Sequence, residues 1–184
     1  STQGVSSAAS DVYKRQVIDR TKLADSDIKA AAKGFYILKD FDPSKPKEGY
    51  IVTQGSSCTS NLVAQMDAIE EAGHNVRIIA AVSEELFNRQ PKEYRDGVLP
   101  ESAKYNMMIV STGTKRMWPV TGVGPLTEEY SLVSDHDNVW LSGGSEGEVL
   151  KEARLDPRSI FEAVARFASE HSERMKRQSE LLQG

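Results

Sequence analysis

Short, nearly continuous apolar segments alternate with amphipathic segments along this chain, and this alternation restricts the fold more than any other feature. The apolar segments are rich in β-branched and aromatic residues, and they lie at residues 35–38, 50–53, 76–82, 106–110 and 138–141. Strands without a polar face belong to sheets covered on both sides, usually by the helices that connect parallel strands. The pattern therefore predicts a three-layer α/β/α domain with a largely parallel sheet.

The segment that follows residues 50–53 has the pattern of an amphipathic helix. Ser56 or Ser57 can cap its amino terminus by accepting a hydrogen bond from a free backbone N–H. Gly73 is a typical residue for the end of such a helix. The apolar residues between them recur at helical spacing: Leu62, Val63, Met66 and Ile69. Further along, Ser83 is expected to cap a short helix that extends to Asn88.

The carboxy-terminal part of the chain predicts one more long helix. Asp156 is a suitable cap for it, and Pro157 suits its first position. Its apolar stripe consists of Ile160, Phe161, Val164, Phe167 and Ala168. Beyond His171 the sequence becomes strongly charged, so we expect residues 171–184 to be a polar helical tail that projects into solvent.

Composition excludes several classes of protein. The 184 residues carry 23 Lys and Arg against 27 Asp and Glu, for a net charge of -4. Nucleic-acid binding depends mainly on clustered cations, so we expect no nucleic-acid partner. No apolar run approaches the roughly 20 residues that span a bilayer, so we expect no membrane partner and a cytoplasmic location. The single Cys excludes an internal disulfide and a cysteine-rich zinc site.

The amino terminus requires separate treatment. Residues 6–16 read SSAASDVYKRQ and resemble the in-frame translation of a sequencing adapter, although a natural Ser/Ala-rich tail is the alternative. Such scars are excluded from reasoning about the fold. We therefore treat residues 1–16 as a disordered artefact and expect the natural gene to continue upstream. Residues 17–34 are expected to link the missing upstream part to a domain at residues 35–170.

Side chains that could support catalysis are few. Cys58 lies near the start of a predicted helix, but no His or carboxylate is close in sequence, so we interpret it as a packed side chain. His74, His136 and His171 lack the spacing of metal ligands. The acidic residues on either side of His136 could hold a cation, but we interpret them as solvated loop residues. We therefore assign no catalytic and no metal-binding residue.

Two glycine-containing turns could bind an anion through converging helix amides. One consists of Gly55, Ser56 and Ser57, and the other lies at residues 143–147. Residues 142–147 resemble a dinucleotide fingerprint, but Ser142 stands where its first Gly belongs, so a tight turn is the better interpretation. Ser145 and Glu148 fit a capping box at the start of the following helix.

Residues 85–100 read ELFNRQPKEYRDGVLP, and this run closely resembles the transketolase family. That family has Leu-Phe, Gln, Tyr-Arg and Val-Leu-Pro at matching spacing. The resemblance extends outward in register. Residues 32–38 are similar to the family's entry into its carboxy-terminal domain, residues 53–57 to its Ala-Thr-Gly-Ser-Glu turn, and residues 147–157 to its ending.

The resemblance implies the carboxy-terminal domain of a three-domain thiamine diphosphate enzyme that moves a two-carbon ketol unit between sugar phosphates. It implies a five-stranded mixed sheet whose first strand, residues 35–38, runs antiparallel to the others. The cofactor and Mg²⁺ belong to the pyrimidine-binding and pyrophosphate-binding domains of a homodimer, and those domains are absent from this chain. We therefore expect this chain to bind no cofactor and to be inactive alone, with a structural, dimer-supporting role.

The chain also departs from the family. Residues 110–113 read VSTG where the family has Val-Glu-Ala-Gly, and residues 121–137 are longer and more polar. These differences suggest a divergent branch or a related enzyme. Two alternatives are the carboxy-terminal half of a 2-oxo acid dehydrogenase subunit and a free-standing module that binds an anion or nucleotide. Loss of the neighbouring domain is expected to expose an apolar interface, for which the candidates are Phe35, Tyr36, Met117 and Trp118.

Overall fold

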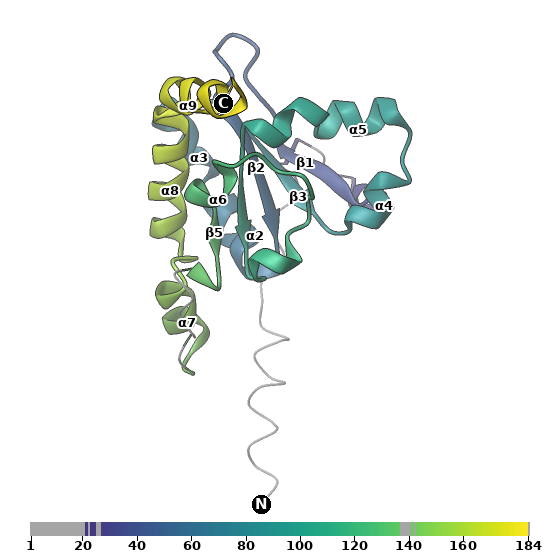
Figure 1. The fold of residues 1–184 in the computed structure, drawn as a ribbon. Helices are drawn as coiled ribbons and strands as arrows, with labels where there is room; N and C mark the ends of the chain where they lie inside the picture. Colours follow the sequence, from purple (N-terminus) through teal and green to yellow (C-terminus); the bar gives the residue numbers. More distant parts are fainter. Residues whose placement is uncertain (1–20, 22, 25–26, 137–140, 142, 184) are drawn as a thin grey trace, which may run out of the picture.

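A computed structural model describes residues 21, 23–24, 27–136, 141 and 143–183, and it contains a five-stranded mixed sheet (Figure 1). The strand order is β1-β3-β2-β4-β5. β2, β3, β4 and β5 are parallel, and β1 is antiparallel to β3. The strands are β1 (Phe35–Lys39), β2 (Gly49–Gln54), β3 (Val76–Ala81), β4 (Met107–Ser111) and β5 (Leu132–Val133). This architecture confirms the predicted α/β fold and the direction of its first strand.

Helices cover both faces of the sheet and give the expected three layers. The first face packs against α2 (Ser56–Ala64), α3 (Met66–Glu71) and α8 (Pro157–Ser169), and the opposite face carries α4 (Glu84–Asn88) and α5 (Lys92–Val98). Each face has its own buried apolar cluster, since neighbouring residues of a strand point to opposite sides. The remaining elements are η2 (Ile28–Lys33), η3 (Glu101–Tyr105), η4 (Lys115–Met117), α6 (Thr127–Tyr130), α7 (Glu146–Glu152) and α9 (His171–Gln183).

The fifth strand differs from the prediction. Residues 138–140 of the expected strand lie outside the described residues, and Leu141 is not in a strand. The strand beside β4 is instead β5, which pairs with Val110 and Ser111. Its two residues lie within residues 121–137, the segment that is more polar than its counterpart in the family, and Val133 is 2% exposed. An edge strand this short carries no recognisable alternation of polar and apolar residues.

The helix after β2 begins differently from the prediction. Its N-cap is Gly55, and Ser56 and Ser57 are the first two helical residues, so the expected serine cap is wrong. Gly55 has φ +100°, and a Cβ at this position would lie 2.2 Å from Oγ1 of Thr112. The turn therefore requires glycine both for its backbone conformation and for the close approach of the loop after β4. The cap uses backbone geometry in place of a side chain.

The amphipathic segment after β2 forms two helices and not one. Gln65 is both the C-cap of α2 and the N-cap of α3, and Leu62 and Ile69 on either side of this break are fully buried. Gly73 has φ +87° and follows the end of α3, as predicted. The two short helices therefore bury the face that was expected from the sequence.

The carboxy-terminal tail was expected to project into solvent, and this prediction is wrong for the first half of the tail. α9 begins after α8 and crosses the amino-terminal end of the sheet (Figure 1). Arg174 and Gln178 are only 2% and 4% exposed, whereas Leu181 and Leu182 near the end of the helix are exposed. The guanidinium of Arg174 donates to the carbonyl oxygens of Phe167 and Glu48, at 2.9 and 2.8 Å. These contacts hold the first half of α9 against the domain.

The described part of the predicted linker at residues 17–34 also packs against the domain. Leu23 and Ala30 are 7% and 2% exposed and belong to the larger apolar cluster. Asp27 caps η2 by accepting a hydrogen bond from the backbone N–H of Lys29. Residues 1–16 lie outside the described residues.

Candidate functional site

A large cavity lies at the carboxyl ends of the parallel strands, where open α/β sheets commonly bind ligands. Its volume is about 810 Å³. The residues that line it come from β1, β2, β3, α2 and α7, and they include Tyr36, Gln54, Ser57, Asn61, Ala81 and Glu146. Gly55, Ser56 and Ser57, the predicted anion-binding residues, lie together at this cavity. The geometry therefore brings the first candidate turn to the expected edge of the sheet.

A carboxylate already faces the first turn of α2. Glu146 accepts a hydrogen bond from the hydroxyl of Ser57 at 2.8 Å through its Oε1 atom. Ser145 and Glu148 form the predicted capping box, which starts α7 and holds Glu146 in its first turn. A negative side chain at the amino terminus of a helix is favourable, and it repels a second anion. Anion binding at Gly55, Ser56 and Ser57 stays a prediction, and such an anion would have to displace Glu146.

Cys58 is a packed side chain, as predicted. It is fully buried, and its thiol donates to the backbone oxygen of Gln54 at 2.8 Å. Burial raises the pKa of the Cys58 thiol, and the hydrogen bond with Thr53 lowers it by a smaller amount. The raised pKa keeps the sulfur protonated at neutral pH, so it lacks the thiolate character of a nucleophile.

His74 and His171 contact different polar residues. His74 lies 3.5 Å from Glu48, measured from Nδ1 to Oε2, and His171 contacts Asn106. Asp135 accepts a hydrogen bond from the backbone N–H of Lys115, and residue 137 lies outside the described residues. Within the described ranges, no group of three or more His, Cys, Asp or Glu is placed to hold a metal ion.

The four candidate interface residues divide into two kinds. Phe35 and Tyr36 are 1% and 9% exposed, so their expected exposure is wrong, because they point into the two apolar clusters. Met117 is 64% exposed, and Trp118 is partly buried against the cluster on the α4 and α5 face. An interface role for Met117 and Trp118 stays a prediction.

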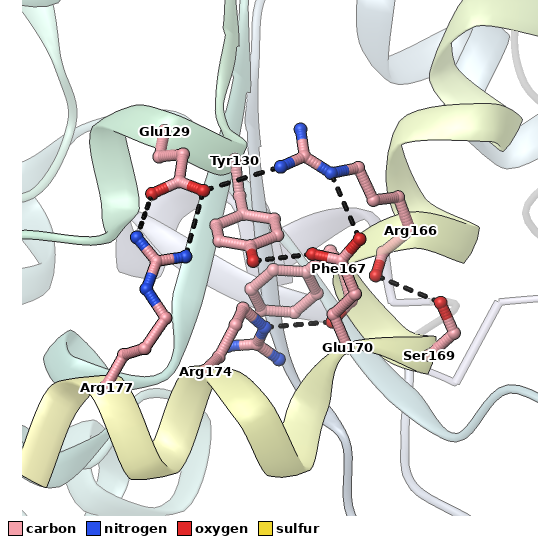
Figure 2. Close-up of polar contacts among 8 residues, drawn as sticks. All are labelled: Glu129, Tyr130, Arg166, Phe167, Ser169, Glu170, Arg174 and Arg177. Atoms are coloured by element: carbon pink, nitrogen blue, oxygen red, sulfur yellow. Dashed lines mark hydrogen bonds and ion pairs between the residues drawn. The ribbon is translucent and has the colours of Figure 1, made fainter.

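Sequence reasoning missed a cluster of charged and aromatic side chains that joins α6, α8 and α9 (Figure 2). The guanidinium carbon of Arg174 lies 3.5 Å from the centroid of the Phe167 ring. Burial lowers the pKa of Arg174 to about 10, which still leaves it protonated at neutral pH. The hydroxyl of Tyr130 donates to Glu170 at 2.6 Å, and Arg177 donates to both carboxylate oxygens of Glu129. The charged composition of the tail concealed these contacts, because charged side chains are almost never fully buried unless they are paired.

The motif at residues 85–100 has a structural role where the contacts are described. The Tyr94 hydroxyl donates to the backbone oxygen of Phe35 at 2.8 Å, which fastens α5 to β1. Phe87 stacks on Phe35 with ring centroids 4.4 Å apart. Val98 and Leu99 belong to the same apolar cluster. None of these contacts forms a nucleophile and base pair, so the motif builds the fold.

Comparisons with known proteins agree on one family. Residues 34–124 match the family described as the transketolase-like TK C-terminal domain. Transketolase 2 of Escherichia coli is 29% identical over 107 residues, and chloroplastic transketolase of Solanum tuberosum is 30% identical over 93 residues. These matches cover 58% and 50% of this chain but only 15% and 12% of the relatives.

Solved transketolase structures share the fold. The enzyme from Leishmania mexicana matches with a TM-score of 0.58 at 22% identity, over 81% of this chain and 20% of that protein. A Pichia stipitis enzyme in complex with sedoheptulose 7-phosphate matches with a TM-score of 0.59 at 20% identity, over 82% of this chain and 20% of that protein. Among the described helices, none has the length and apolar content needed to cross a membrane.

Proposed function

Because this chain contains a C-terminal domain of the transketolase family, we propose that it serves as that domain in a transketolase-type transferase. The observation that carries the proposal is the unequal coverage of the matches. They extend over 81–82% of this chain but only 20% of the solved transketolases. The remaining parts of such an enzyme would carry the transfer of a two-carbon ketol unit between sugar phosphates, with thiamine diphosphate as the electron sink.

The described residues do not fit the diphosphate and Mg²⁺ of that cofactor. Magnesium is held by carboxylate oxygens together with phosphates, and the described residues include no suitable cluster. The amide-rich turn at Gly55 faces the carboxylate of Glu146, which would repel a diphosphate. We therefore assign the cofactor to the pyrimidine-binding and pyrophosphate-binding domains of the whole protein. This domain would support their assembly as a homodimer, with Met117 and Trp118 as the candidate contact.

Calorimetric titration tests the division of labour between domains. We expect thiamine diphosphate with Mg²⁺ to give no saturable heat with the 184-residue chain. Escherichia coli transketolase 2 is the positive control under the same buffer and salt. A saturable heat with the isolated chain would contradict the proposal, because the chain would then hold a cofactor site of its own.

A chimaera tests the supporting role directly. Residues 21–183 would replace the C-terminal domain of Escherichia coli transketolase 2, and the matched control is the same enzyme with that domain deleted. We expect the chimaera to recover dimer formation and ketol transfer that the deletion lacks. A well-folded chimaera that assembles no better than the deletion would contradict the supporting role. Among the described residues, no specific contact favours a 2-oxo acid dehydrogenase subunit or a free-standing regulatory module.

A further inference from the structure

A second pocket, of about 200 Å³, lies on the face of the sheet that carries α4 and α5. It is lined by residues of β1, α4, α5 and η3, by Leu99 after α5 and by the segment after η4. Its apolar lining consists of side chains that are each less than a tenth exposed: Phe35, Phe87, Leu99 and Val120. Pro119 also lines the pocket, and Asn88 and six charged side chains form the rest of the lining. The pocket therefore combines a rigid apolar floor with a polar rim.

The charged side chains of the rim have partners, with one exception. Lys92 pairs with Asp96, Lys104 pairs with Glu101 at 2.8 Å, and Glu84 accepts hydrogen bonds from the backbone and hydroxyl of Thr121. Arg95 is in none of these pairs. Its Nε atom is buried and has no hydrogen-bond partner within the described part of the chain. A buried guanidinium N–H is normally hydrogen-bonded, so this donor indicates a group that the described residues do not supply.

The chemistry of that group follows from the charges and the size of the pocket. Arg95, Lys92 and Lys104 balance Glu84, Asp96 and Glu101, so the rim as a whole has no excess positive charge to attract a dianion. A planar guanidinium suits a carboxylate, which carries a single charge. Pockets for whole metabolites usually measure about 300–1,000 Å³, so this smaller one suits a carboxyl group on a short aliphatic stem. We propose that the pocket binds a carboxylate group and that Arg95 holds it.

The test observes the Arg95 side chain directly. The 184-residue chain, labelled with ¹⁵N, is titrated with sodium acetate, and sodium chloride at equal ionic strength is the reference. We expect the Nε–Hε resonance of Arg95 to move along a saturable curve with acetate, in the millimolar range, and not with chloride. Phosphate should bind more weakly than acetate. Arg89 is the C-cap of α4 and forms an exposed ion pair with Glu85, and its Nε–Hε resonance is the internal control.

Variants and protein concentration identify the source of the carboxylate. Arg95→Lys should abolish the saturable response of thermal stability to acetate, and Arg89→Lys should preserve it. Glu84→Gln should tighten acetate binding, because it removes a negative charge from the rim that would repel a carboxylate. If the Nε–Hε resonance of Arg95 moves with protein concentration alone and acetate reverses this movement, the carboxylate is a side chain of a second copy of the chain. If the resonance moves with acetate only, the carboxylate is that of a free acid. An Arg95 resonance that responds to neither, or that moves no more than Arg89, would overturn the proposal.

Discussion

The two ends of the sheet are held by different means. At the amino-terminal end, Arg174 reaches across from α9 and ties together the segments before β2 and β4 and the end of α8. At the carboxyl end, the loops approach one another at Gly55 and Thr112, and an open cavity of about 810 Å³ lies beside them. Hydrogen bonds to one buried cation hold the first end, and backbone conformation holds the second. The contrast indicates that the amino-terminal end serves stability and leaves the carboxyl end accessible.

Loss of the buried cation should have the largest effect. Arg174→Met keeps an apolar stem but leaves three acceptors without their donor: the carbonyls of Glu48 and Phe167 and the side-chain oxygen of Asn106. The Phe167 carbonyl is buried and the other two acceptors are half-buried, and each lost hydrogen bond costs about 1 kcal/mol, so we expect a loss of about 3 kcal/mol in the free energy of unfolding. Urea denaturation followed by circular dichroism measures it.

Arg177→Met is the matched control for that variant. Arg177 lies one turn away on the same helix, and its pair with Glu129 is partly exposed, so its loss should cost less than about 1 kcal/mol. Equal losses for the two variants would show that α9 as a whole, and not the buried guanidinium, fastens this end of the sheet.

A substitution at the carboxyl end should have a smaller effect. Gly55→Ala forces a side chain onto a backbone with φ +100° and places Cβ close to Thr112. Strain of this kind costs about 2 kcal/mol, and it should appear as a lower unfolding midpoint in urea.

Gly97→Ala separates backbone strain from a general effect of replacing glycine. Gly97 lies inside α5, and a Cβ there meets nothing within 4 Å. Since Ala favours a helix over Gly by about 1 kcal/mol, this variant should be neutral or more stable. If Gly55→Ala is equally harmless, the turn after β2 does not depend on its conformation, and the contrast between the ends of the sheet is weaker.

The same contrast explains what the sequence could predict. Four of the strands coincide with the predicted apolar segments. A strand that is buried on both faces consists of a continuous run of apolar residues, which is recognisable in the sequence without knowledge of the fold. β5 was missed because a strand of two residues is too short to show a pattern of polar and apolar residues. The cap at Gly55 was misassigned because Ser is a preferred N-cap residue. The need for glycine comes from the close approach of Thr112, which is distant in the sequence. The carboxyl-end turn itself was placed correctly, since a strand followed by Gly-Ser-Ser has a local signature.

The packing of α9 depends on contacts that no local pattern contains. Arg174 bonds to segments far away in the sequence, before β2 and before β4. A scan of hydropathy counts it as a solvated charge, whereas in the fold its guanidinium stacks on Phe167. The pocket around Arg95 escaped prediction for the same reason, because its rim is assembled from α4, α5 and η3. The burial of a polar residue cannot be predicted from the sequence around it when the elements that cover it come from distant parts of the chain.

The smallest expected effect is a pH dependence at the amino-terminal end of the sheet. Asn106 accepts from Arg174 through Oδ1, so its amide nitrogen faces Nε2 of His171 at 3.3 Å. That nitrogen of His171 must therefore accept the hydrogen bond, which requires the neutral ring. Partial burial lowers the pKa of His171, and the positive charge of Arg174 lowers it further, while Glu48 opposes both.

The sign of the effect follows from the lowered pKa. As pH falls below the ordinary value of about 6.5, the unfolded chain binds a proton at this position before the folded chain does. The free energy of unfolding should therefore decrease as pH falls from about 7.5 through 6.5. The decrease should stop once the pH is below the lower pKa that His171 has in the folded state. His171→Gln keeps an acceptor that cannot titrate, so it should flatten this slope, and His74→Gln is the control for the other histidine at this end. Urea midpoints at several pH values measure the slope. A wild-type slope that His171→Gln leaves unchanged would mean that the contact with Asn106 does not depend on the neutral ring of His171.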